Sequence, residues 1–156
     1  MQFQVVPGKG GATNASLVYR PNEFSFDVVP APVSGFTTIL LDDLNIEVDK
    51  SGKVISVWGM CPHTRWKDAT LTPPSAVDAE VIVLTPAPLK QSVSVRLTPE
   101  REYLPTFVDR NQGWVKIEGK GRPRAAAMVM PGVIVEVGDD GEFCALWLHP
   151  QSGILN

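Results

Sequence analysis

Apolar and polar residues alternate most regularly in two stretches of the chain, residues 44–58 and 133–147. In each stretch, an alternating run reaches a short turn containing Asp and Gly, and a second apolar run returns from it. Alternation with a period of two places the apolar side chains on one face of a β-strand. Such turns usually need one residue at positive φ, which glycine adopts without steric cost. Each stretch therefore predicts a long β-hairpin.

The two hairpins correspond to each other at a constant offset of 89 residues, the separation of Glu47 from Glu136. The strand predicted at residues 114–118 corresponds, at the same offset, to the strand predicted at residues 25–29, so the correspondence extends beyond the hairpins. This pattern predicts two related halves. Identical residues at this offset are Glu47 and Glu136, Val48 and Val137, Gly52 and Gly141, and Trp58 and Trp147.

The rest of the chain is divided into short extended segments by fourteen prolines and thirteen glycines. Many short strands between such residues are typical of an all-β sandwich or barrel. We therefore expect one compact all-β domain, an antiparallel sandwich or barrel-like structure built from a pseudo-twofold repeat of the long hairpin. One short helical turn is expected near residues 99–104, with Thr98 as its N-cap and Pro99 at its first position.

The domain organisation follows from the hairpins and the proline-rich segments between them. Residues 1–66 are expected to form the first β half and residues 80–150 the second, joined by a connecting segment at 67–79 that contains Pro73 and Pro74. Residues 151–156 are polar for the most part and are expected to form a loose C-terminal tail.

Composition and charge limit the classes of partner. The 44% of apolar residues and 20% of charged residues fit a globular protein. The net charge of −3 argues against nucleic acid, because neutralising phosphates requires clustered Lys and Arg. The N-terminal residues lack the regions of a signal peptide, and no apolar run of about 18 residues predicts a transmembrane helix. We therefore expect a cytoplasmic protein without a nucleic-acid or membrane partner.

The stretch with the most chemical potential is residues 61–66, Cys-Pro-His-Thr-Arg-Trp, just after the end of a predicted strand. Functional loops are often found at such positions. A Cys61 thiolate activated by the His63 imidazole would make the protein a small thiol-dependent hydrolase or transferase. The sequence supplies no further residue that orients the base. Cys61 and His63 therefore stay candidates, and no catalytic residue is assigned.

Four residues of the chain are potential zinc ligands: Cys61, His63, Cys144 and His149. Along residues 142–149, alternation places Phe143, Ala145, Trp147 and His149 on one face and Cys144 on the other. The four ligands are therefore not expected to meet. We predict no metal site and no cofactor.

The tryptophans have two interpretations. Trp58 and Trp147, at equivalent positions, are interpreted as core or half-core aromatics related by pseudosymmetry, and the alternative is an exposed platform for a partner or a sugar. Trp66 lies among charged residues without apolar alternation. Trp and Arg are frequent in interface hot spots, so Arg65 and Trp66, together with His63, are predicted to form a binding surface.

The function favoured by these patterns is that of a non-enzymatic binding protein whose partner is another protein, of the inhibitor, immunity or adaptor type. The grounds are that no catalytic set, nucleotide loop or basic face can be identified in the sequence. Two alternatives stay open, the thiol-dependent enzyme and a protein that binds a small ligand between its two halves.

Overall fold

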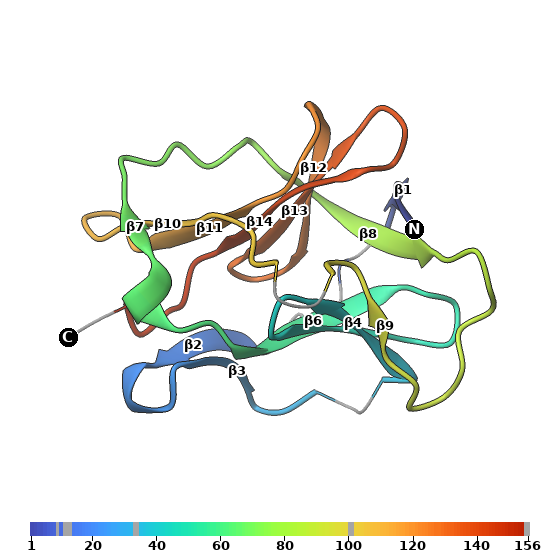
Figure 1. Ribbon diagram of the computed structural model, residues 1–156, viewed down its shortest axis with the longest axis horizontal. Coiled ribbons are helices and arrows are strands. Elements are labelled where there is room, and N and C mark those ends of the chain that lie inside the picture. Colours follow the sequence, from blue (N-terminus) through green and yellow to red (C-terminus); the bar gives the residue numbers. More distant parts are fainter. Residues whose placement is uncertain (9, 11–13, 33–34, 100–101, 155–156) are drawn as a thin grey trace.

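The computed structural model describes residues 1–8, 10, 14–32, 35–99 and 102–154. The chain forms two mixed β-sheets, which lie one above the other in Figure 1. Within the described ranges, the only helical segments are two 3-10 turns, η1 (Pro21–Glu23) and η2 (His63–Arg65). No helix in this part of the chain is long and apolar enough to cross a membrane.

The smaller sheet has six strands. Their order is β2 (Ser16–Arg20), β3 (Ser25–Val29), β6 (Val54–Met60), β5 (Leu44–Val48), β4 (Thr37–Leu41) and β9 (Val95–Arg96). The first five strands pair antiparallel, whereas β4 and β9 run parallel.

The larger sheet has eight strands. Their order is β1 (Gln2–Pro7), β8 (Val77–Leu84), β12 (Pro123–Met130), β13 (Val133–Gly138), β14 (Phe143–Leu148), β11 (Trp114–Glu118), β10 (Thr106–Asp109) and β7 (Lys67–Asp68). Two of its pairs, β8 with β12 and β7 with β10, are parallel. The expected all-β class is confirmed. The expectation of purely antiparallel pairing is wrong, and the sheets do not close into a barrel.

The main hydrophobic core receives side chains from both sheets. Alternate residues of β4, β5 and β6 enter it from the smaller sheet, among them Ile39 and Ile46, and Val115 and Leu146 enter it from the larger sheet. Burying one such aliphatic side chain contributes about 1.5–3 kcal/mol. The alternation read from the sequence therefore identifies the faces that hold the two sheets together.

Both long hairpins form, and their pairing registers agree at the offset of 89 residues. In β5–β6, Glu47 lies opposite Ser56, and in β13–β14, Glu136 lies opposite Ala145. A bulge follows each of these pairs at the same place. The agreement extends to the neighbouring strands β3 and β11. Phe26 pairs with Gly59 as Val115 pairs with Leu148.

Two smaller expectations fare differently. The helical turn near residues 99–104 falls partly on residues 100 and 101, which lie outside the described ranges. Thr98 accepts a hydrogen bond from the Asp42 amide instead of capping a helix. In the segment expected to be a loose tail, the Gln151 amide donates to the Leu17 carbonyl at 2.9 Å and Ile154 is buried in the core, and residues 155 and 156 lie outside the described ranges.

Candidate functional site

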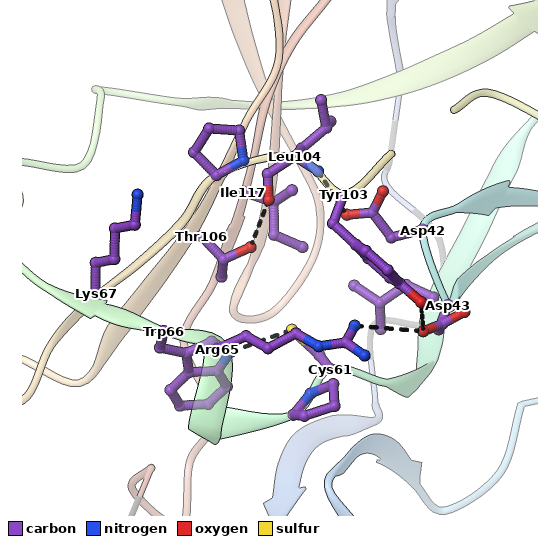
Figure 2. A pocket seen from close by; sticks show the side chains of 13 residues that line it. Asp42, Asp43, Cys61, Arg65, Trp66, Lys67, Tyr103, Leu104, Thr106 and Ile117 are labelled. Carbon is purple, nitrogen blue, oxygen red and sulfur yellow. Dashed lines mark hydrogen bonds and ion pairs between the residues drawn. The ribbon is translucent and has the colours of Figure 1, made fainter. Parts of the chain in front are cut away.

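A pocket of about 250 Å³ lies between the two sheets. The smaller sheet contributes the β4–β5 turn and the end of β6, followed by η2, and the larger sheet contributes β10 and β11 (Figure 2). Residues 103–105, which precede β10, complete the wall. The pocket is therefore lined by two separate regions of the chain, residues 42–67 and residues 103–117. It is lined by Asp42, Asp43, Leu44, Cys61, Pro62, Arg65, Trp66, Lys67, Tyr103, Leu104, Pro105, Thr106 and Ile117.

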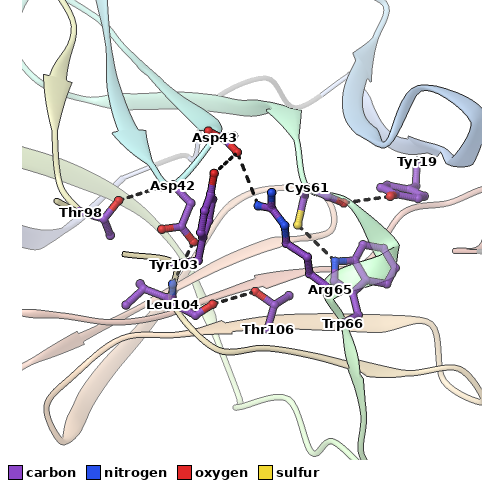
Figure 3. Close-up of polar contacts among 10 residues, drawn as sticks. All are labelled: Tyr19, Asp42, Asp43, Cys61, Arg65, Trp66, Thr98, Tyr103, Leu104 and Thr106. Atoms are coloured by element: carbon purple, nitrogen blue, oxygen red, sulfur yellow. Dashed lines mark hydrogen bonds and ion pairs between the residues drawn. The ribbon is translucent and has the colours of Figure 1, made fainter. Parts of the chain in front are cut away.

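Trp66 lies in the core and not on the surface. Its side chain is only 8% exposed, and its ring packs against Tyr19 at 4.8 Å and Phe26 at 6.2 Å between centroids. The indole Nε1–H donates to the Cys61 Sγ at 3.4 Å (Figure 3). The expectation of an exposed Trp66 is wrong, because the η2 turn directs the chain back so that this ring covers the aromatic residues of β2 and β3.

Cys61 lines the pocket but is poorly suited to act as a nucleophile. Its side chain is buried, and this burial raises the pKa of the thiol to about 12. The nucleophilic form of cysteine is the thiolate, which is scarce at neutral pH when the pKa is that high. The local environment therefore favours a structural role for Cys61.

The imidazole of His63 lies against aromatic rings. It stacks on Phe24 with 5.2 Å between centroids, and its Nδ1 lies 3.4 Å from the Tyr19 hydroxyl. The Tyr19 hydroxyl also donates to the Cys61 carbonyl and accepts from the His63 amide. His63 therefore belongs to an aromatic cluster with Tyr19 and Phe24. The Tyr19 hydroxyl holds the backbone at residues 61 and 63.

Asp42 is the most unusual residue of the pocket. It occupies the two-residue turn between β4 and β5 at a φ of 55°. Its Oδ2 accepts from the Leu104 amide at 3.2 Å, which ties the turn to the segment before β10 (Figure 3). Its Oδ1 is buried and has no hydrogen-bond partner among the described residues. Burial raises the pKa of this carboxyl above its ordinary value of 3.8.

Three exposed side chains form the rim of the pocket. The Asp43 Oδ2 accepts from the Tyr103 hydroxyl at 3.1 Å and lies 3.7 Å from the Arg65 Nη1. The Arg65 guanidinium also lies over the Tyr103 ring, 4.0 Å from its centroid. Figure 2 shows these three groups converging beside the opening from three separate segments. The arrangement joins a cation, an anion and an aromatic ring at the mouth of the pocket.

The four potential metal ligands named from the sequence do not form one cluster. His149 stacks on Trp114 with 4.6 Å between centroids, and its Nε2 lies 3.0 Å from the Gln112 carbonyl. Cys144 lies in β14, with its Sγ near the Glu142 carbonyl. Across the described ranges, no three His, Cys, Asp or Glu side chains gather to hold a metal ion.

The two equivalent tryptophans differ in exposure. Trp147 is 4% exposed, as expected for a core aromatic, but Trp58 is 41% exposed. Each indole Nε1–H donates to the glutamate at the equivalent position, Trp58 to Glu47 and Trp147 to Glu136. Trp58 also borders a second hollow of about 220 Å³, on the outer face of the smaller sheet. Of the core or half-core tryptophans expected from the sequence, Trp147 is therefore in the core, whereas Trp58 is only partly covered.

Of the residues named from the sequence, Cys61, Arg65 and Trp66 line the pocket, whereas His63 lies beside it. Sequence reasoning missed Asp42, Asp43 and Tyr103. The Asp-Asp pair between two alternating runs marks a two-residue turn. Tyr103, however, is 60 residues away from Asp43 in the sequence, so no local pattern predicts their contact. Comparisons with protein-family models, curated proteins and solved structures find no match for this chain.

Proposed function

We propose that the protein is a non-enzymatic binding protein that holds a small molecule in the pocket between its two sheets. The observation that carries the proposal is Asp42, a residue of the pocket wall whose buried Oδ1 has no partner among the described residues. Leaving a buried polar group without a hydrogen bond costs about 1–3 kcal/mol. A ligand that donates a hydrogen bond to this oxygen removes that cost.

The backbone of Asp42 supports the same interpretation. A non-glycine residue at positive φ is uncommon, although aspartate tolerates it better than most residues. Such conformations cluster at binding sites, where the surrounding structure holds them in place. Here the Thr98 hydroxyl accepts from the Asp42 amide at 2.8 Å, and the Leu104 amide holds Oδ2. The turn is thereby fixed so that one carboxylate oxygen stays available.

The size and lining of the pocket define the class of ligand. A volume of about 250 Å³ lies just below the range of about 300–1,000 Å³ for ligand sites, so the occupant is small. Leu44, Trp66 and Ile117 supply apolar wall area, and Asp42 supplies one acceptor. The matching ligand has a compact apolar body and one N–H or O–H donor. The Arg65–Tyr103–Asp43 rim closes over it.

The test compares 1-butanol with its isomer 1-methoxypropane, which lacks the donor, and with butylamine, which donates through a charged ammonium group at neutral pH. Backbone amide shifts are measured by NMR while 1-butanol, butylamine or 1-methoxypropane is added. Butanol and butylamine are expected to shift the Leu104 amide in a saturable way. The ether is expected to bind about tenfold more weakly, because it cannot donate to Asp42. Equal binding of ether and alcohol would refute the role of Asp42.

A matched pair of variants completes the test. Asp42→Ala is expected to remove the preference for the alcohol over the ether. Asp139→Ala changes an exposed aspartate in another turn, where it pairs with Arg124, and is expected to keep the preference. A preference that survives in Asp42→Ala contradicts the proposal.

A protein partner, the function favoured by the sequence, is the second candidate. The observation in its favour is that several large apolar side chains of the smaller sheet are exposed. Exposed apolar patches frequently mark interaction sites. The Arg65 and His63 surface predicted from the sequence stays part of this candidate, but Trp66 is too buried to contribute. These exposed side chains are Phe24, Val29, Trp58 and Met60.

We also propose that the two halves are copies of one ancestral unit, related by a pseudo-twofold axis. The support is the shared register and the shared bulges of β5–β6 and β13–β14. The Glu–Trp hydrogen bond recurs in both hairpins at the same positions. The copies have diverged on their outer faces, where Trp147 is covered and Trp58 is open.

A further inference from the structure

The outer face of the larger sheet is covered by the chain itself. The segment of residues 69–76, between β7 and β8, crosses this face at the top of Figure 1. It inserts Leu71 into a second apolar cluster with Ile134, Ala145 and Trp147. The segment is extended and contains two prolines. An extended, proline-containing segment therefore covers the hydrogen-bonded pair of Glu136 and Trp147.

Two hydrogen bonds hold the covering segment in place. The Ala69 amide donates to the Val108 carbonyl at 2.9 Å, and the Leu71 amide donates to the Asp109 Oδ2 at 3.0 Å. A cation completes the cover, because the Lys116 Nζ lies 5.2 Å from the centroid of the Trp147 ring. Trp147 is thus in contact with an apolar side chain and with a cation of its own sheet.

Among the described residues, the equivalent face of the smaller sheet is covered less completely, with Ala31 and Pro32 at the border of the hollow beside Trp58. Trp58 is 41% exposed, and Met60, two residues further along the same strand face, is 50% exposed. The residue at the position equivalent to Lys116 is Asp27, which lines the hollow beside Trp58 together with Glu47. The Asp27 Oδ2 accepts from the Arg20 Nε at 3.3 Å. The open tryptophan is therefore bordered by two carboxylates, one of them already paired with an arginine, whereas its covered counterpart has an ammonium group over the ring.

Ser56 is a buried polar residue of the same face. It lines the hollow beside Trp58, yet it is 0% exposed, and its Oγ has no hydrogen-bond partner among the residues that the structure describes. Buried hydroxyl groups are usually paired. This oxygen therefore belongs to the floor of the face and not to its accessible surface.

We infer that this outer face, defined here as Asp27, Ser56, Trp58 and Met60, binds an extended peptide segment of a partner protein that carries a lysine or arginine. The cation lies over the Trp58 ring and joins Arg20 beside the Asp27 carboxylate. Neighbouring apolar residues of the segment cover Met60. A cation over an indole ring is a favourable contact, which the nearby carboxylate strengthens. The inference rests on the protein-partner candidate and names its surface and chemistry.

The probe for the experiment is a library of random twelve-residue peptides displayed on phage and selected against the full-length protein. Recovered peptides are synthesised, and their affinities are measured by fluorescence polarisation. The expected set is enriched in peptides with one Lys or Arg beside apolar or proline residues. Recovery of no peptide, or of peptides without a cation, overturns the inference.

Three variants map the binding surface. Trp58→Ala is expected to weaken binding at least about tenfold. Asp27→Lys, which gives this face the cation that the covered face has, is expected to weaken it as strongly through repulsion of the peptide's cation. The control, Asp139→Ala, changes an exposed aspartate in a turn of the larger sheet, where it pairs with Arg124, and is expected to leave the affinity unchanged. Circular dichroism checks that each variant is folded.

The alternative outcomes separate this surface from the broader candidate. Peptides that bind Trp58→Ala and the unaltered protein equally well would leave a protein partner in place but remove the Trp58 face as its site. A dimer in sedimentation velocity that Trp58→Ala dissociates would assign the face to a second copy of the chain, which overturns the peptide inference.

Discussion

Phe3 and Val83 lie opposite each other in the β1–β8 ladder, and each donates its backbone amide to the carbonyl of a turn glycine. Val83 donates to Gly52 at 2.8 Å, in the turn of the β5–β6 hairpin, and Phe3 donates to Gly141 at 2.7 Å, in the turn of β13–β14. One hairpin turn is therefore hydrogen-bonded to β8 and the other to β1, at residues that lie opposite each other. These bonds join the ends of both hairpins to one pair of residues.

This arrangement makes both turn glycines sensitive, but not equally. Gly52 and Gly141 have φ angles of 87° and 77°, so alanine at either position is expected to cost at least about 1 kcal/mol of folding free energy. A Cβ at Gly52 would lie 2.4 Å from the Val83 oxygen, whereas one at Gly141 would lie 3.1 Å from the Phe3 oxygen. Gly52→Ala is therefore expected to be the more destabilising in urea unfolding.

Asparagine at the same positions distinguishes backbone strain from the steric contact. Asparagine tolerates positive φ better than alanine, so Gly141→Asn is expected to recover part of the stability lost in Gly141→Ala. Gly52→Asn is expected to recover little, since its Cβ meets the same Val83 oxygen. Equal recovery at both positions would show that the contact with Val83 relaxes at low cost.

The long hairpins were predictable because their information is local. Alternation and an Asp- and Gly-containing turn specify strand, turn and return within fifteen residues or so. The parallel pairs were not predictable for the opposite reason. β7 and β9 have two residues each, too few for any alternation, and their partners lie far away along the chain.

Side-chain directions failed where a bulge intervenes. Strict alternation places Phe143 on the face of Trp147, yet Phe143 joins the main core with Leu146. The bulge between the pairs of Glu136 and Val137 shifts the alternation by one residue. Trp66 failed through long-range packing, because the rings that bury it, Tyr19 and Phe26, belong to β2 and β3. Neither effect leaves a trace in the neighbouring sequence.

Both cysteines are expected to resist alkylation in the folded protein. Burial raises the pKa of the Cys61 thiol to about 12 and also raises that of Cys144. Iodoacetamide reacts with the thiolate, so labelling at pH 8 is expected to be slow until urea unfolds the chain. Mass spectrometry of timed samples gives the rate at each site. Rapid native labelling of Cys61 would restore the thiol-dependent enzyme as a candidate.

Asp42 and Asp109 are expected to give opposite pH dependences of stability. Burial raises the pKa of Asp42, so its contribution is fully present below the ordinary value of 3.8 and is lost as the pH rises through the raised pKa. Hydrogen bonds from the Leu71 and Gln112 amides lower the pKa of Asp109. Its contribution is present above the ordinary value and is lost as the pH falls through the lowered pKa.

Asparagine variants separate the two carboxyl groups. Relative to the unaltered protein, Asp42→Asn is expected to gain stability as the pH rises from about 3.8, the ordinary value. Asp109→Asn is expected to lose stability relative to the unaltered protein at lower pH, as the pH rises through the lowered pKa of Asp109 to the ordinary value of 3.8, because the unaltered protein gains the charged hydrogen bonds there. Urea unfolding at a series of pH values measures both differences. A pH-independent difference for Asp42→Asn would show that its carboxyl titrates alike in the folded and unfolded states.

Trp66 and Trp58 provide a matched comparison of a buried and an open indole. Trp66 is 8% exposed and is enclosed by Tyr19 and Phe26, so Trp66→Ala leaves a cavity and is expected to cost about 3–5 kcal/mol. Trp58 is 41% exposed and has one hydrogen bond, to Glu47. Trp58→Ala is therefore expected to cost about 1 kcal/mol or less. Unfolding free energies in urea measure both, and a small loss for Trp66→Ala would return this side chain to the surface.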